Sequence, residues 1–169
     1  MSRFGNAVVL AVSFLLLNGC TQTAPPANTA ADEAAIRAIN PIWFKAYTAS
    51  DVEGVVALYA EDAVFSGPGA PAARGPAAIR EYFKKDIAES AVAGITFKAG
   101  PKTDVGVSGD LGWEWGTFTV LDKSGATVDV GKYVSIFRRK DGKWQIIRDI
   151  YNSDTPPPAP APAEAAPPK

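Results

Sequence analysis

The sequence predicts an α+β fold in which three helices come first and an antiparallel sheet follows. Up to about residue 94 of the 169, apolar residues recur at spacings of three and four, which is the period of a helix face. After Gly94, apolar residues alternate with polar ones, which is the period of a strand with one buried face. Asp141-Gly142, between two alternating runs, is a strong hairpin signal. Helices followed by a strand meander are typical of α+β domains.

The first helix is expected over about residues 32–49. Its apolar face is formed by Ile36, Ile39, Trp43 and Tyr47. Pro41 lies inside this stretch and predicts either a kink or a restart with Asn40 as the N-cap. Residues 50–53 (SDVE) fit a capping box that opens a short second helix, and Gly75-Pro76 opens a third.

A brief strand is expected at residues 63–66, between the second and third helices. Four longer alternating segments follow the third helix and predict a meander, at about residues 95–107, 111–121, 127–139 and 143–152. Residues 122–125 (DKSG) suit a type I turn followed by a left-handed glycine bulge.

The first twenty residues predict an export signal. Arg3 precedes an apolar run over 7–17, which is too short to span a bilayer that needs about 20 residues but suits a signal peptide. The run ends in Leu-Asn-Gly-Cys, which resembles the bacterial lipoprotein box and implies cleavage after residue 19 and lipidation of Cys20. The alternative is an ordinary secretory signal followed by a lone cysteine. Two or three acyl chains on Cys20 would make the lipid anchor the protein's only membrane attachment.

The resemblance to a lipoprotein signal also predicts a cellular location. Asp after the lipidated cysteine is the usual inner-membrane retention signal, and this chain has Thr21 there. In a Gram-negative cell we therefore expect the periplasmic face of the outer membrane. Residues 20–31 are expected to form a flexible linker, 32–154 the domain, and 155–169 a disordered Pro/Ala-rich tail.

Composition excludes several classes of function. The chain has no histidine, which removes His-based acid–base and nucleophilic catalysis and most catalytic zinc or iron sites. No metal or cofactor is expected. Lys and Arg number 17 against 18 Asp and Glu, and the basic residues are scattered, so nucleic-acid binding is not expected either.

The two hairpin turns predict the registers of the last three long strands. They pair Val134 with Asp149 and Glu114 with Val134, which puts Lys132 diagonal to both acids on the same face. The opposite face is then expected to carry Tyr133, Phe137, Trp144, Ile146 and Ile150. The cluster of two acids and a lysine is interpreted as a pocket that binds a ligand or carries a proton, or as a structural ion network.

Three segments together resemble the NTF2-like superfamily and, within it, the DUF4440/SnoaL-like domains. They are SDVEGVVALYAEDAVFSGPG (50–69), RGPAAI (74–79) and GKYVSIFRRKDGKWQIIRDIYNSD (131–154). The resemblance covers residues 32–154 and implies a cone-shaped, cystatin-like fold, with helices packed on a curved sheet around a pocket. It also implies frequent homodimerisation through the sheet, which agrees with Trp113 and Trp115 on the face away from Glu114. Members include isomerases, dehydratases, cyclases and binding modules, so the fold does not settle the function.

Further pocket candidates come from the first helix and the last strand. Trp43 and Tyr47 lie on a helix that closes the cavity in this fold, and Tyr151 and Asn152 follow Asp149 in the RDxxNSD segment. The ketosteroid isomerase members of the superfamily provide a test of catalysis. Their tyrosine acid and base aspartate fall on Trp43 and Gly67, and their protonated aspartate falls near Val134. None of these three positions has the required chemistry.

The leading hypothesis is therefore an envelope lipoprotein whose domain binds a small molecule or a partner without catalysis. The alternative is a lyase or isomerase that uses Glu114 or Asp149 as a base, with Lys132 as electrostatic support. A third possibility is a structural dimerisation module.

Overall fold

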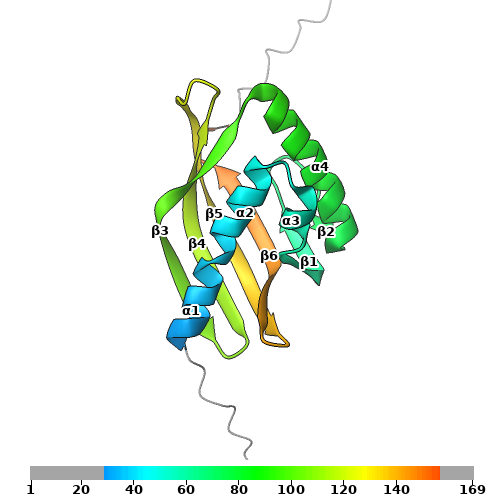
Figure 1. Cartoon of the computed structure of the whole chain (residues 1–169), viewed down its shortest axis with the longest axis vertical. Coiled ribbons are helices and arrows are strands. Elements are labelled where there is room, and N and C mark those ends of the chain that lie inside the picture. The colour runs from blue at the N-terminus through cyan, green and yellow to red at the C-terminus, as the bar shows by residue number, and fades with distance from the viewer. Residues whose placement is uncertain (1–28, 157–169) are drawn as a thin grey trace, which may run out of the picture.

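The computed structural model of the chain describes residues 29–156, and its elements follow the predicted order (Figure 1). The helices are α1 (Thr29–Arg37), α2 (Ile39–Thr48), α3 (Val52–Val56) and α4 (Gly75–Ala93). The strands are β1 (Tyr59–Ser66), β2 (Ala73–Arg74), β3 (Thr96–Ser108), β4 (Leu111–Leu121), β5 (Thr127–Lys140) and β6 (Lys143–Ser153). The α+β class is confirmed, and the two-residue β2 is an addition to the prediction.

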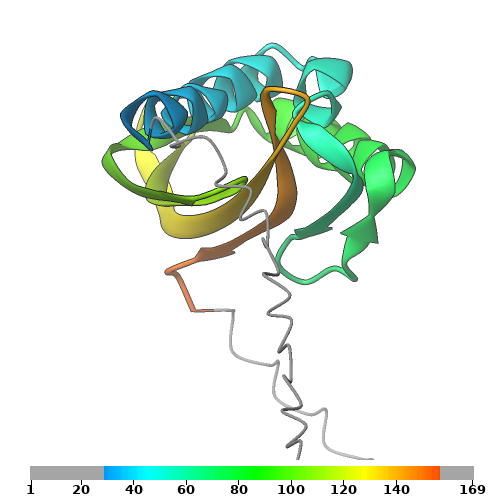
Figure 2. The same ribbon diagram turned by 90° about the horizontal axis from the view of Figure 1, so that it is seen from below.

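One sheet holds all six strands, in the order β2-β1-β6-β5-β4-β3. Neighbours are antiparallel except β1 and β6, which run parallel. The sheet is strongly curved, and α1 and α2 close its concave side while α4 lies along β1 (Figure 2). The main core fills the space between the sheet and the helices, with Phe65, Phe83 and Phe137 fully buried. A smaller cluster of Phe118, Val120 and Tyr133 lies further along β4 and β5.

The long first helix is divided at Ala38 and not at the proline. Pro41 cannot donate to the carbonyl of residue 37, and its ring crowds that carbonyl, so the helix ends at Arg37 and restarts at Ile39. Ala38 occupies the N-cap position without a side-chain hydrogen bond. The prediction of Asn40 as N-cap is wrong, and its amide instead donates to the Tyr133 hydroxyl (3.0 Å).

The other helix boundaries follow local chemistry. Asp51, not Ser50, caps α3, because its carboxylate accepts the Gly54 amide at 2.8 Å. Gly75-Pro76 opens α4 as predicted, and Gly94 ends it in the left-handed conformation (φ 68°). Within residues 29–156, no helix combines the length and the apolar character needed to cross a membrane.

Two bulges change the predicted strand registers. Both turns form as expected, with Leu121 opposite Thr127 and Lys140 opposite Lys143. Beyond the turns, the pairing skips one residue at position 128 and another at position 147. Glu114 and Asp149 therefore lie opposite Ser135 and not Val134, and one residue of slip exchanges the two faces of a strand.

The slip corrects the prediction for the sheet faces. The concave face carries Glu114 and Asp149 together with Tyr133, Ser135 and Phe137, not with Lys132. Tyr133, Phe137, Trp144 and Ile146 were expected on the opposite face, but all four belong to the cores on the helix side. Ile150 alone of that group is on the outer face, where it is 54% exposed.

Candidate functional site

A pocket lies between α2, α4 and the concave face of the sheet. Its cavity volume is about 50 Å³. Most of its walls are aromatic rings, and two carboxyl groups, a serine and an asparagine lie between them. The lining residues are Asn40, Trp43, Phe44, Tyr47, Phe65, Asp86, Phe97, Phe118, Tyr133, Ser135, Asp149 and Tyr151. An apolar cavity with a few convergent polar groups is the usual form of a small-molecule site.

Asp149 is the polar centre of the sheet wall. The Tyr59 hydroxyl donates to its Oδ2 at 2.6 Å and the Ser135 hydroxyl to its Oδ1 at 2.9 Å. Trp43 Nε1 in turn donates to the Tyr59 hydroxyl at 3.2 Å. Burial raises the pKa of Asp149, while the hydrogen bonds from Tyr59, Ser135 and the backbone of Ile150 act in the opposite direction.

Asp86 brings a second carboxyl to the pocket, from α4. The Tyr47 hydroxyl donates to its Oδ2 and is also 2.9 Å from the Ser90 hydroxyl. The pKa of Asp86 is raised above its usual value, chiefly by burial, and the hydrogen bond from Tyr47 offsets part of this increase. The ring of Tyr47 stacks on Trp43, with centroids 5.1 Å apart, so the same tyrosine forms part of the aromatic wall.

Glu114 lies behind the pocket wall and is 1% exposed. The Tyr133 hydroxyl donates to its Oε1 at 3.0 Å, and the same hydroxyl accepts from Asn40. Its Oε2 has no hydrogen-bond partner among the described residues. Burial raises the pKa of Glu114, and the polar side chains of Asn40, Tyr133 and Thr103 and the charge of Arg37 lower it. Glu114 is linked to the pocket through the hydroxyl of Tyr133, which lines it.

The structure brings some of the predicted site residues to the pocket and places the others elsewhere. Trp43, Tyr47, Asp149 and Tyr151 line the pocket. Glu114 does not line it but contacts it through a lining residue. Lys132 lies on the outer face, where it forms an ion pair with Asp154, so the predicted cluster of two acids and a lysine does not exist. Asn152 is exposed and opposite Lys132.

Sequence reasoning missed five polar residues of the site, namely Asn40, Tyr59, Asp86, Tyr133 and Ser135. Tyr59, Tyr133 and Ser135 reach the site through strand registers that the sequence did not predict. Asp86 left a signal, because it follows Tyr82 and Phe83 by four and three positions and therefore falls on the apolar face of its helix. An acid on such a face has to meet a polar partner or a cavity.

The pocket is lined by acidic side chains and by no basic ones. Its lining includes Asp86 and Asp149 but no Lys or Arg. In the part of the chain that the structure describes, no group of three His, Cys, Asp or Glu side chains could hold a metal ion. The arrangement can therefore accept hydrogen bonds and stack on apolar surfaces, and it lacks a cation that would hold an anionic group.

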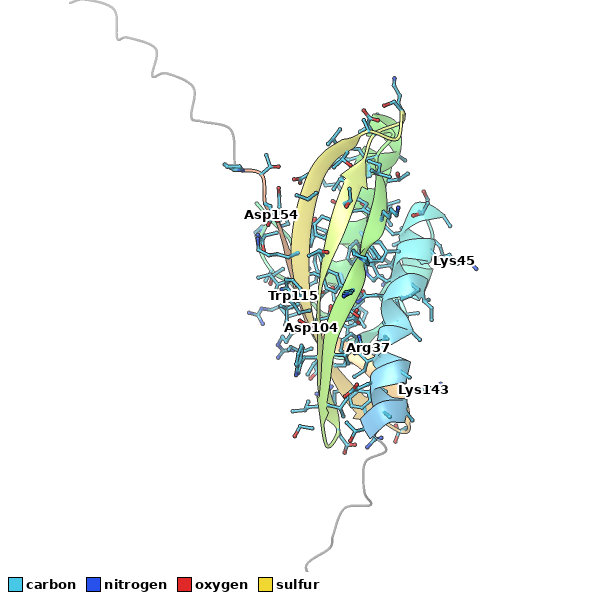
Figure 3. All side chains as sticks on the ribbon, turned by 90° about the vertical axis from the view of Figure 1, so that its left-hand side faces the viewer. Arg37, Lys45, Asp104, Trp115, Lys143 and Asp154 are labelled. Carbon is cyan, nitrogen blue, oxygen red and sulfur yellow. The ribbon has the colours of Figure 1, made fainter. Side chains whose placement is uncertain are left out.

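The outer face of the sheet carries several exposed apolar side chains. Trp113 is 43% exposed, Trp115 39% and Val130 43%. Figure 3 shows Trp115 and Asp154 on the side of the sheet away from α1 and α2. Exposed apolar patches of this kind are typical of protein contact surfaces.

Comparison with known proteins identifies the fold. A family model described as a SnoaL-like domain matches residues 42–147. An NTF2-like protein with a cystatin-like fold from Novosphingobium aromaticivorans has a TM-score of 0.66 and 22% identity, over 72% of this chain and 81% of that one. A ketosteroid isomerase-like protein from Erwinia carotovora atroseptica has a TM-score of 0.58 and 22% identity, over 74% and 98%.

A third solved structure is an NTF2-like protein from Streptomyces avermitilis that is provisionally described as a dehydratase. It has a TM-score of 0.63 and 18% identity, over 75% of this chain and 99% of that one. No curated protein matches the sequence. At these identities, the likeness to the solved structures concerns the fold and not the reaction.

Proposed function

Because the chain belongs to the SnoaL-like domain family, within the NTF2-like superfamily, we propose that its domain binds a small molecule in the aromatic pocket and does not transform it. The observation that supports this is the hydrogen bonding of the Asp149 carboxyl group. Both of its oxygens already accept hydrogen bonds from hydroxyl groups, one from Tyr59 and one from Ser135. A carboxyl group held in this way is suited to fixing the orientation of a ligand, and less suited to removing a proton from one.

Native mass spectrometry of the purified full chain tests the proposal, because it reports a retained ligand directly. We expect a bound mass that is lost or weakened in Asp149→Asn. Lys132→Met is the matched control, because it also removes a charge from the sheet but lies outside the pocket. An unliganded spectrum, together with no thermal stabilisation by any member of an aromatic compound library, would contradict the proposal.

A second candidate function is a lyase or isomerase reaction with Asp149 as the base. The observation that favours it is that burial raises the pKa of Asp149, because a base with a pKa nearer neutrality is more effective. Two of the solved structures similar to this chain carry the descriptions ketosteroid isomerase-like and, provisionally, dehydratase. Asp149→Asn distinguishes the two functions: an enzyme would keep its ligand and lose turnover, whereas a binding protein shows no product with either form.

We also propose that the chain is an envelope lipoprotein anchored through Cys20, on the periplasmic face of the outer membrane in a Gram-negative cell. The support is the signal-like segment and its Leu-Asn-Gly-Cys ending, which lie outside the described residues. Cys20→Ser should release the protein from the membrane fraction. Continued membrane association of this variant would contradict the anchor.

The exposed face of the sheet supports a homodimer, which is also what a purely structural dimerisation module would need. Trp115→Glu places a charge in the centre of this face, and we expect it to convert a dimer to a monomer in light scattering. The Lys143→Glu variant, altered at the β5–β6 turn, is the control for the added charge. A wild-type protein that stays monomeric at high concentration would contradict the homodimer proposal.

A further inference from the structure

We propose that the pocket selects a small organic cation, namely a protonated amine attached to a body of about one ring. This inference rests on the proposed binding function and specifies the chemical class of its ligand. It follows from three properties of the pocket: its charge, its walls and its free hydrogen-bonding capacity.

The charged groups of the pocket have one sign. Asp86 reaches it from α4 and Asp149 from β6, and no lining residue carries a positive charge. The nearby cations on α1 and α2 are directed elsewhere. Arg37 donates to the backbone and the side chain of Thr103 on β3, and Lys45 points away from the sheet into solvent (Figure 3). An anionic ligand would therefore meet two acids with nothing to balance its charge.

The walls between these acids are aromatic. Trp43 and Tyr47 stack on each other, and Phe118 contacts Tyr151 edge to face, with centroids 5.8 Å apart. The faces of such rings carry partial negative charge and attract ammonium groups, most strongly where water is excluded. In such a pocket a cation interacts favourably with both the ring faces and the carboxyl groups. A neutral ring gains only the apolar contact.

The two carboxyl groups can accept further hydrogen bonds. A carboxylate offers about four acceptor positions. Among the described residues, Asp86 accepts one side-chain hydrogen bond, from Tyr47, through Oδ2. Asp149 accepts one side-chain hydrogen bond on each oxygen. The remaining positions suit the N–H donors of a protonated amine, which would stabilise the charged form of each acid.

Three probes of similar size and different charge test the inference on the full wild-type chain at pH 7. They are benzylammonium, benzyl alcohol and benzoate, each titrated by calorimetry. We expect benzylammonium to bind at least about tenfold more tightly than benzyl alcohol, and benzoate to show no binding. Equal affinity for benzylammonium and benzyl alcohol, or tighter binding of benzoate, would overturn the inference. Because this series needs no variant, it decides the question even if a substitution prevents folding.

Variants show whether the two acids are responsible. Asp86→Asn and Asp149→Asn should each weaken benzylammonium about tenfold and leave benzyl alcohol unchanged. Asp104→Asn, which removes an exposed acid from β3, is the control and should change neither affinity. If benzyl alcohol binds as well as the cation and both pocket variants have no effect, the binding function stands and cation selection fails. If none of the three probes binds while native mass spectrometry shows a retained ligand, cation selection likewise fails and the binding function stands.

Discussion

Tyr59→Phe is the sharpest test of the hydrogen-bond network around Asp149. The substitution removes one oxygen atom from a side chain that is 4% exposed and leaves its ring packing in place. Two hydrogen bonds disappear with it, one donated to Asp149 and one accepted from Trp43. Any loss of stability therefore reports on those two bonds and not on packing.

The magnitude follows from the two bonds. A hydrogen bond to a carboxylate contributes about 1.5–3 kcal/mol, and a buried donor left without a partner costs about 1–3 kcal/mol. Asp149 keeps its bond to Ser135, and Trp43 is only partly buried, so both values fall toward the lower end. We expect Tyr59→Phe to lower the free energy of unfolding by about 2–4 kcal/mol, measured by urea denaturation followed by tryptophan fluorescence.

The pH dependence adds a second readout. The Tyr59 hydrogen bond lowers the pKa of Asp149 in the folded protein, so its loss lets burial raise that pKa further. A folded state with a higher pKa loses stability as the pH rises, so the deficit of the variant should grow between about pH 4 and pH 7.

Tyr82→Phe is the matched control. Among the described residues its hydroxyl forms a hydrogen bond with that of Tyr151 alone, at 3.2 Å, so its loss should cost less than about 1 kcal/mol. The reasoning is refuted if Tyr59→Phe costs no more than this control, or if its cost is the same across the pH range.

Three other changes test the core, the attachment of α1 and the buried glutamate. Phe83→Ala should cost about 3–5 kcal/mol because Phe83 is 1% exposed, whereas Val92→Ala, 93% exposed on the same helix, should stay within about 0.5 kcal/mol; similar losses in urea denaturation would contradict this. Asp32→Asn removes the carboxylate that Arg139 Nη1 contacts at 2.8 Å, so it should cost about 1–3 kcal/mol and speed hydrogen exchange in α1; unchanged exchange there would exclude this role. Burial raises the pKa of Glu114, so the wild type loses stability as the pH rises above the pKa of about 4.3 that glutamate has in the unfolded chain. Glu114→Gln should therefore flatten the dependence of the unfolding free energy on pH. An unchanged slope would show that Glu114 does not cause this dependence.

Local sequence determined the elements and the turns of this protein. Asp141-Gly142 forms its tight turn with positive φ at both residues (51° and 76°), and Gly125 takes the left-handed conformation (φ 82°) in the preceding loop. Gly75-Pro76 starts α4 and Gly94 ends it. These features were predictable because each depends on the conformational preferences of a few neighbouring residues.

The candidate site was predictable only in part. Trp43, Tyr47 and Tyr151 line the pocket, because helix periodicity, or position near Asp149 in the last strand, brings them to the concave side. Asp86 was missed although its position on an apolar helix face was readable. Lys132 was placed in the site by a register that the folded sheet does not adopt.

The sequence by itself determined the order of the helices and the four long strands, that no histidine chemistry is available, and that Asp149 lies in the last strand. Only the tertiary structure decided which side chains meet that aspartate. The bulges at positions 128 and 147 occur at two ordinary β-branched residues, Val128 and Ile147, which carry no local turn signal. Strand curvature is set by the packing of the whole sheet against the helices, and a single extra residue turns every later side chain to the other face.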